Sequence, residues 1–407
     1  MGNAGGERRR AGRRRRAGRT AALAGACAAL LTMVACGTDG EPASTSTTAA
    51  AAGDTRVEPV ARPAGPGDDG DVLDAAEIQP PSGARSWRVD YRTTAIDGAP
   101  AGARMTLTVP MTPPPDGGFG LVVYAHPTKG TADACAPSLE GPTAIPLISE
   151  FLRAGWAVAA PDYEGLAAEG PHPYLVGRSE ARNLLDATRA AAEVKGAGIT
   201  PGGPAVLWGF SQGGHAALFA AQLAPELAPE LDLRGVAVAA PVSDPAAFVR
   251  RSEDWPAQFG ILATVVGAYA EAYPELDPAT VLTPEAVDDL SLLEQRCIAD
   301  INAAFDRPIA EQLVRSPRDE PAYAARLAEN LTATGPIAMP ALVVQGGADQ
   351  IIDPADTAAL VDRLCGLGVA TSSLVRAGED HAVRADDVLI PWIQGRMAGG
   401  EPVDTCP

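Results

Sequence analysis

The segment Gly209–Gly213 contains a serine whose surroundings suit nucleophilic catalysis. Its sequence is Gly-Phe-Ser-Gln-Gly, with Ser211 at the centre. The apolar run 204–208 before it predicts a buried strand, and the helix formers of 214–223 after it predict a helix. A serine on so sharp a strand-to-helix turn is strained and exposed, and the flanking glycines let the two elements pass close together. We therefore predict that Ser211 is a nucleophile.

A nucleophilic serine needs a general base and an acid that orients the base, and two downstream loops offer them. The chain has four histidines, of which only His381 lies far beyond Ser211, in the loop 377–382. Between them, the apolar run 341–345 predicts a strand that leads through a glycine turn to Asp349. Serine, aspartate, histidine is one of the chain orders that such triads follow. We expect His381 to be the general base and Asp349 to fix its tautomer.

The acid and the oxyanion donors have to be chosen among neighbouring residues. Asp353 also follows the strand, but it precedes a proline and fits the N-cap of a helix. The oxyanion of acyl transfer needs two hydrogen-bond donors, and the backbone N–H of Gln212, directly after the nucleophile, is one candidate. The other should come from the loop 126–130. There Pro127 has no N–H, so Thr128 is the candidate donor.

The remaining histidines have simpler explanations than catalysis. His126 is expected to brace the loop that carries Thr128. His215 lies one helical turn after Ser211, and we expect it to be a packing residue. His172 is expected either to line the substrate pocket or to make an ordinary loop contact.

The N-terminus predicts export. Residues 1–35 contain eight arginines and one glutamate, and they end in the apolar run 20–35. This arrangement is typical of an export signal, and the run is too short and too rich in alanine for a membrane span. Met33–Gly37 resembles a bacterial lipoprotein cleavage site, which predicts that 1–36 is a signal peptide and that Cys36 is lipidated. Plain secretion is the alternative.

The charge of the processed chain limits its partners. The full sequence has a formal net charge of −19, and loss of the eight arginines and one glutamate of 1–35 makes it −26. So acidic a protein is a poor partner for nucleic acid, and basic residues will not draw it to anionic lipid. The membrane contact that we expect is through a lipid on Cys36. The sequence implies neither a cofactor nor a metal.

Four cysteines follow Cys36 and predict two disulfides. They are Cys135, Cys297, Cys365 and Cys406, and an even number in an exported chain allows three pairings. Proximity in the inferred fold favours Cys365 with Cys406, within the C-terminal segment, which leaves Cys135 with Cys297. A metal site is the alternative, but no close spacing of cysteine and histidine supports it.

The rest of the chain divides into a linker, a core and an insertion. Residues 37–75 are small and polar and predict a disordered linker. In 76–244, two alternating runs predict a hairpin, after which strand and helix patterns alternate, as in a mainly parallel sheet covered on both faces. The pattern of 245–339 is helical, and strands resume in 340–407. We predict that 245–339 is a cap over the carboxyl ends of the strands, with a separate helical domain as the alternative.

With these features together, the chain resembles the secretory lipase family of α/β-hydrolases, whose bacterial members are exported. The resemblance spans roughly residues 80 to 400, and besides Gly209–Gly213 the matching segments are 134–138, 160–165 and 172–177. It implies an α/β-hydrolase fold with a mainly parallel sheet, flanking helices and an inserted helical cap. It also implies a serine ester hydrolase, with Asp349 and His381 completing the triad.

We therefore expect an exported serine hydrolase that cleaves carboxylic esters, such as acylglycerols, through an acyl-enzyme. The apolar stretch 259–267 in the expected cap favours a pocket for an acyl chain. A peptidase or an acyltransferase using the same triad is the alternative. A binding lipoprotein without catalysis is a third possibility, which the serine turn and its two partners oppose.

Overall fold

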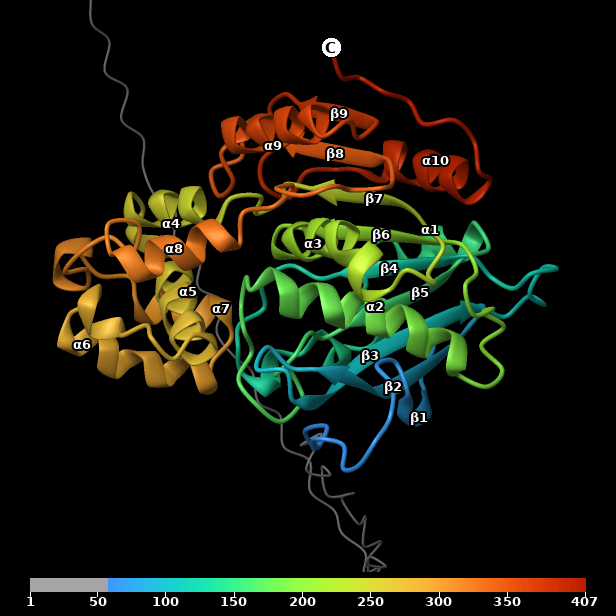
Figure 1. Ribbon diagram of the computed structural model, residues 1–407, viewed down its shortest axis with the longest axis horizontal. Coiled ribbons are helices and arrows are strands. Elements are labelled where there is room, and N and C mark those ends of the chain that lie inside the picture. The colour runs from blue at the N-terminus through green and yellow to red at the C-terminus, as the bar shows by residue number, and fades with distance from the viewer. Residues whose placement is uncertain (1–57) are drawn as a thin grey trace, which may run out of the picture. The chain divides into compact units, whose positions relative to one another are not determined.

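The structure, a computed structural model, describes residues 58–407 (Figure 1). The predicted signal peptide, Cys36 and most of the predicted linker lie outside the described residues. The centre of the described part is a nine-stranded sheet with the order β1-β2-β3-β5-β4-β6-β7-β8-β9. Within residues 58–407, none of the helices combines the length and the apolar character needed to cross a membrane.

The sheet has an antiparallel edge and a parallel body. The antiparallel strands are β1 (Val72–Ile78), β2 (Ala84–Thr94) and β3 (Pro100–Pro110), and β3 joins the body by antiparallel pairing with β5. The parallel strands are β4 (Leu121–Ala125), β5 (Ala157–Pro161), β6 (Ala205–Phe210), β7 (Leu233–Ala239), β8 (Ala341–Gly346) and β9 (Thr371–Arg376). The mainly parallel sheet expected from the sequence is confirmed.

Alternation along the buried strands gives the sheet two apolar faces. In β4, Leu121 and Val123 join one core, which α2 (Gly177–Glu193), α3 (Gln212–Leu227) and α9 (Pro354–Gly366) cover. Val122 and Tyr124 join the opposite core, which α1 (Ile148–Arg153) and α10 (Asp386–Met397) cover. Helices therefore flank both faces, and the carboxyl ends of the parallel strands stay free to carry functional loops.

The chain between β7 and β8 forms a helical segment with its own apolar core. Its helices are α4 (Pro245–Glu253), α5 (Phe259–Ala272), α6 (Pro284–Asp288), α7 (Ile298–Ala304) and α8 (Pro321–Glu329). Figure 1 shows them together at the left, beside one end of the sheet. Buried Phe259, Leu262, Tyr269, Phe305 and Tyr323 pack in this separate cluster.

The boundary between the predicted linker and the core needs correction. The predicted linker extends to residue 75, but β1 already begins at Val72. Val60 is buried, and its N–H and carbonyl bond to Ala167 and Glu169. The prediction was wrong because β1 is an edge strand with mostly exposed side chains, so its pattern is weak.

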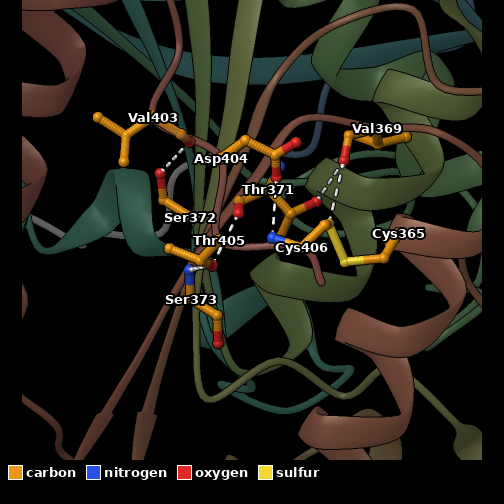
Figure 2. Close-up of a disulfide and its surroundings, with 9 residues drawn as sticks. All are labelled: Cys365, Val369, Thr371, Ser372, Ser373, Val403, Asp404, Thr405 and Cys406. Atoms are coloured by element: carbon orange, nitrogen blue, oxygen red, sulfur yellow. Dashed lines mark hydrogen bonds between the residues drawn. A yellow bond between two sulfur atoms is a disulfide. The ribbon is translucent and has the colours of Figure 1, made fainter.

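Two disulfides join distant parts of the chain. Cys135 is bonded to Cys297 and Cys365 to Cys406, with Cα–Cα distances of 5.5 and 5.6 Å. They are the pairs that the sequence favours. The first ties the loop after β4 to the helical segment, and the second ties α9 to the C-terminal tail that lies along β9 (Figure 2).

Candidate active site

The turn between β6 and α3 has the strained geometry that its sequence predicts. Ser211 has φ 56° and ψ −117°, a conformation that L-residues rarely adopt. A Cβ on Gly209 would lie 1.9 Å from the carbonyl oxygen of Gly213, and a Cβ on Gly213 would lie 1.9 Å from that of Ala125. Only glycine fits at either position, so β6, α3 and the end of β4 pack tightly around the serine.

Three side chains from three loops form a continuous hydrogen-bonded chain. Nε2 of His381 lies 3.0 Å from Oγ of Ser211, and Nδ1 of His381 lies 2.8 Å from Oδ2 of Asp349. The His381 side chain is 18% exposed, whereas that of Asp349 is fully buried. The predicted residues thus meet at the carboxyl ends of β6 and β8, in the order serine, histidine and aspartate, which is the arrangement of a catalytic triad.

Hydrogen bonds hold Asp349 in its ionised form. Burial alone would raise its pKa, but the hydrogen bond and the charge of His381 oppose burial, as do the N–H groups of Ile352 and Ile351. Both N–H groups donate to Oδ1, at 2.9 and 2.8 Å. The net result is a pKa of Asp349 below its ordinary value. A carboxylate fixed in this way can hold the Nδ1–H tautomer of His381.

Backbone hydrogen bonds fix the loop that carries His381 to the turn that carries Asp349. Gly347 N–H donates to Arg376 O, and Ala348 N–H donates to Glu379 O, both at 2.8 Å. The ring of His381 also lies against Phe210, with a centroid separation of 5.0 Å. His381 is therefore positioned from both sides.

Asp353 has a different environment from Asp349. It is the N-cap of α9, where its carboxylate accepts from the N–H of Ala355 at 2.9 Å, and Pro354 follows it. The structure brings Asp349, and not Asp353, to His381.

The two candidate oxyanion donors follow the adjacent strands β6 and β4. Gln212 is the first residue of α3 and is buried. Thr128 lies three residues after Ala125, the residue that pairs with Gly209 across β4 and β6. The hydroxyl of Thr128 is 2.7 Å from that of Tyr174, a contact that sequence reasoning did not find.

The three other histidines are buried, and each makes at least one hydrogen bond to a neighbouring group. His126 donates from Nδ1 to Pro127 O at 2.7 Å, and burial lowers its pKa to about 3, so it stays neutral as a brace of that loop. His172 donates from Nδ1 to Glu164 O at 2.8 Å and lines a cavity of about 390 Å³ together with residues of the helical segment such as Ala268 and Leu293.

His215 does more than pack. It is fully buried, and both ring nitrogens have polar partners: Glu180 at Nδ1 and the carbonyl of Asn330 at Nε2. The sequence gives no sign of this contact, because Glu180 lies 35 residues upstream on another helix. Among residues 58–407, no group of three or more histidine, cysteine, aspartate or glutamate side chains is arranged to hold a metal ion.

Comparison with known proteins places this geometry in a family. A profile of the secretory lipases matches residues 143–405. A probable inactive lipase of Mycobacterium tuberculosis is 31% identical over 336 residues, which cover 76% of this chain and 73% of that protein. Lipase A of Arthroderma benhamiae is 27% identical, over 78% of this chain and 71% of that protein.

Solved structures show the same fold at lower identity. Candida antarctica lipase A matches with a TM-score of 0.71 at 20% identity, over 84% of each chain. The rice cell wall degrading esterase LipA of Xanthomonas oryzae matches with a TM-score of 0.66 at 19% identity, over 82% of this chain and 97% of that chain. The fold is therefore that of the lipase α/β-hydrolases. The chain belongs to the secretory lipase family, as the sequence motifs indicated.

Proposed function

We propose that this protein is an active, exported serine hydrolase of carboxylic esters, with Ser211, His381 and Asp349 as its catalytic triad. The observation that carries the proposal is the hydrogen-bonded chain from Ser211 Oγ through His381 to Asp349. Membership of a lipase family supports an ester hydrolase. A relative named a probable inactive lipase makes turnover by this chain the first matter to test.

The proposed mechanism is a two-step acyl transfer. Ser211 Oγ attacks the ester carbonyl while its proton passes to Nε2 of His381, and Asp349 stabilises the imidazolium. The alkoxide that forms accepts from the backbone N–H of Gln212 and from Thr128. Collapse of this intermediate expels the alcohol, which takes its proton from His381. Water, deprotonated by the same nitrogen, then releases the acid from the acyl-enzyme.

The proposed substrates are acylglycerols or similar apolar esters. The helical segment places Ala268, Leu290 and Leu293 along a cavity of about 390 Å³, whose wall also includes His172. Nε2 of His172 lies 3.3 Å from the Gln212 side chain, so the cavity wall is one side chain away from the residue after the nucleophile. Each methylene buried there would contribute about 0.8 kcal/mol, or roughly a fourfold gain in kcat/KM where the transition state uses it fully.

Export and lipid attachment at Cys36 are part of the same proposal. Two disulfides suit an oxidising compartment. The relatives include a secreted triacylglycerol lipase of Malassezia globosa, which is 28% identical over 54% of this chain. Peptide mass spectrometry of the membrane fraction would test the anchor, with Cys36→Ala as the control that should move the protein to the soluble exported fraction.

One substrate comparison tests the proposed activity. We expect the protein to hydrolyse p-nitrophenyl esters and to leave aminoacyl-proline amides intact, with kcat/KM rising from acetyl to medium-chain esters. Ser211→Ala should lower kcat by at least about 10⁴-fold while the protein remains folded. A folded wild-type protein without esterase activity would contradict the proposal. A monotonic fall in rate from two to eight carbons would contradict the apolar acyl site.

A further inference from the structure

A second histidine–carboxylate pair lies buried beside the proposed nucleophile. Glu180, in the first turn of α2, and His215, one turn after Ser211 in α3, have side chains that are 1% and 0% exposed. Nδ1 of His215 lies 2.5 Å from Oε2 of Glu180. The other oxygen, Oε1, accepts a hydrogen bond from Nε2 of Gln212 at 2.9 Å. The pair therefore contacts the residue whose backbone N–H is a proposed oxyanion donor.

The partners of this pair determine where its protons lie. Nε2 of His215 is 2.9 Å from the carbonyl oxygen of Asn330, which can only accept, so Nε2 carries a hydrogen. One further proton lies between Nδ1 and Oε2, on either the imidazole or the carboxyl group. In both arrangements the pair has no net charge, which is how titratable groups tolerate complete burial. Oε1 of Glu180 is thus left as a fixed acceptor for Gln212.

The amide of Gln212 is held by two acceptors. Besides Glu180, its Nε2 contacts Nε2 of His172 at 3.3 Å. His172 donates from Nδ1 to Glu164 O, which makes its Nε2 an acceptor. Both amide hydrogens of Gln212 therefore have a partner. A side chain held in this way restrains the first peptide of α3, and with it the direction of the backbone N–H.

The same pair joins the helical segment to the nucleophile helix. Asn330 directly follows α8, and its carbonyl receives the hydrogen bond from His215. Its side-chain oxygen accepts from Gly177 N at 2.8 Å, and its amide nitrogen donates to Tyr273 OH at 3.1 Å. The end of α8 and the starts of α2 and α3 thus meet at one buried cluster.

We propose that Glu180 and His215 are positioning residues, which aim the backbone N–H of Gln212 at the oxyanion and hold the helical segment against the nucleophile helix. This inference rests on the proposed esterase function. Neither side chain touches the serine, so the pair acts through Gln212 and not on the substrate.

Two substitutions at position 180 test whether the hydrogen bonds of Glu180 are what matters. Glu180→Ala removes the acceptor for Gln212 and the partner of His215. Glu180→Gln keeps both contacts, because its oxygen can accept from Gln212 while its N–H donates to Nδ1 of a neutral His215. Loss of one oxyanion donor costs about 10²–10³-fold in kcat, and a misdirected donor should cost part of that. We expect Glu180→Ala to lower kcat about tenfold to hundredfold with little change in KM, and Glu180→Gln to restore most of it.

The test measures two quantities that depend on the oxyanion donors: kcat and the affinity for a boronic acid. Each variant is assayed with p-nitrophenyl butyrate, kcat is normalised to titrated active sites, and the inhibition constant of butylboronic acid is measured, since its tetrahedral adduct places an oxygen in the same hole. That constant should rise in step with the loss of kcat. Gln212→Leu deletes the side-chain amide but keeps the backbone N–H, and it should behave like Glu180→Ala. It takes the place of Glu180→Ala in the test if that variant does not fold.

Asp186→Asn is the matched control. Asp186 is a buried carboxylate on the same helix, but its partners are Thr93 and Arg189, and neither Gln212 nor His215. It should change the melting temperature without changing kcat per active site. Unchanged kcat and boronate binding in both Glu180→Ala and Gln212→Leu, with Ser211→Ala inactive, would overturn the positioning role and leave the proposed function intact. Absence of wild-type turnover would instead contradict the proposed function.

Discussion

Two histidine–carboxylate pairs lie near Ser211, and only one has hydrogen-bond partners that suit proton transfer. His381 with Asp349 and His215 with Glu180 share the same contact, from Nδ1 to a carboxylate oxygen, at 2.8 and 2.5 Å. Each Nε2 also has an oxygen partner about as close, at 3.0 and 2.9 Å. The distances alone do not distinguish them.

The partner at Nε2 makes the difference. His381 faces the hydroxyl of Ser211, which can donate, so Nε2 can stay unprotonated and receive a proton. His215 faces the carbonyl of Asn330, which can only accept, so its Nε2 must keep its hydrogen. Access adds to this contrast, because the side chain of His381 is 18% exposed and that of His215 is fully buried. The same pair of groups can thus serve chemistry on loops and positioning between helices.

The largest expected effect comes from exchanging a carboxylate for an amide at Asp349. Its Oδ1 accepts from Ile351 and Ile352, and its Oδ2 accepts from His381 and from Gln345. An asparagine must point its NH₂ group at donors whichever way it turns. Asp349→Asn should therefore disfavour the Nδ1–H tautomer of His381 and lower kcat by about 10⁴-fold.

Exchanging a carboxylate for an amide should have only a small effect on kcat at Glu180 and at Asp353. Glu180→Gln is tolerated because His215 needs the Nε2–H tautomer, which an amide donor at Nδ1 favours. Asp353→Asn keeps the N-cap of α9 and should leave kcat within about twofold. Steady-state kinetics on the three variants measures the contrast. An active Asp349→Asn beside an inactive Asp353→Asn would reverse the assignment of the acid.

The next prediction concerns stability, where the expected effect is smaller. Replacing His215 should lower the folding free energy more than replacing His381 does, which is the reverse of the order expected for kcat. His215→Leu leaves the buried Glu180 with Gln212 as its one remaining partner, and removing one side of a buried pair of this kind costs about 3–5 kcal/mol. His381→Leu also removes a partner from buried Asp349, but Ile351, Ile352 and Gln345 still donate to that carboxylate, so the folding free energy should change by less than about 1 kcal/mol, although catalysis is lost. Urea unfolding of both variants tests this. Equal losses of stability would mean that burial does not distinguish the two pairs.

The sequence predicts well that Ser211, Asp349 and His381 come together, because the patterns that mark them are local. Ser211 and Asp349 each follow a buried apolar strand, and parallel strands bring their carboxyl ends to one edge. His381 could be assigned by elimination, since only four histidines exist and three lie near or before the serine. The connections that hold this loop, from Ala348 to Glu379 for example, are backbone contacts that carry no sequence signal.

The buried pair and the edges of the sheet could not be predicted. Glu180 is an acidic residue in the first turn of a helix, which is where surface helices often carry one, so nothing marks it as buried. The edge strands β1 and β9 have few fully buried side chains. Pairing with a neighbour on one side and with the C-terminal tail on the other stabilises β9, and this depends on residues 30 or more positions away.

The smallest expected effect comes from changing this C-terminal tail. The tail supports the strand that leads to His381, and not the helices that carry Glu180 and His215. Thr405 N–H donates to Thr371 O at 2.8 Å, and Ser372 donates to Val403 O at 2.6 Å, so the tail covers the free edge of β9 (Figure 2). The disulfide from Cys365 to Cys406 keeps the tail in place, and β9 leads directly into the loop of His381.

The variant Cys365→Ser/Cys406→Ser should lose about 2–4 kcal/mol of folding free energy, the usual range for a disulfide. It should also lower kcat severalfold, because a loosened β9 lets the His381 loop move. Thr405→Val is the milder control: it deletes the side-chain hydrogen bonds to Thr371 and Ser373, keeps the disulfide, and should cost about 1 kcal/mol. Urea unfolding and kinetics on both proteins measure this. Loss of stability with unchanged kcat would show that the tail protects only the sheet edge and that the His381 loop holds its position through its contacts with β8.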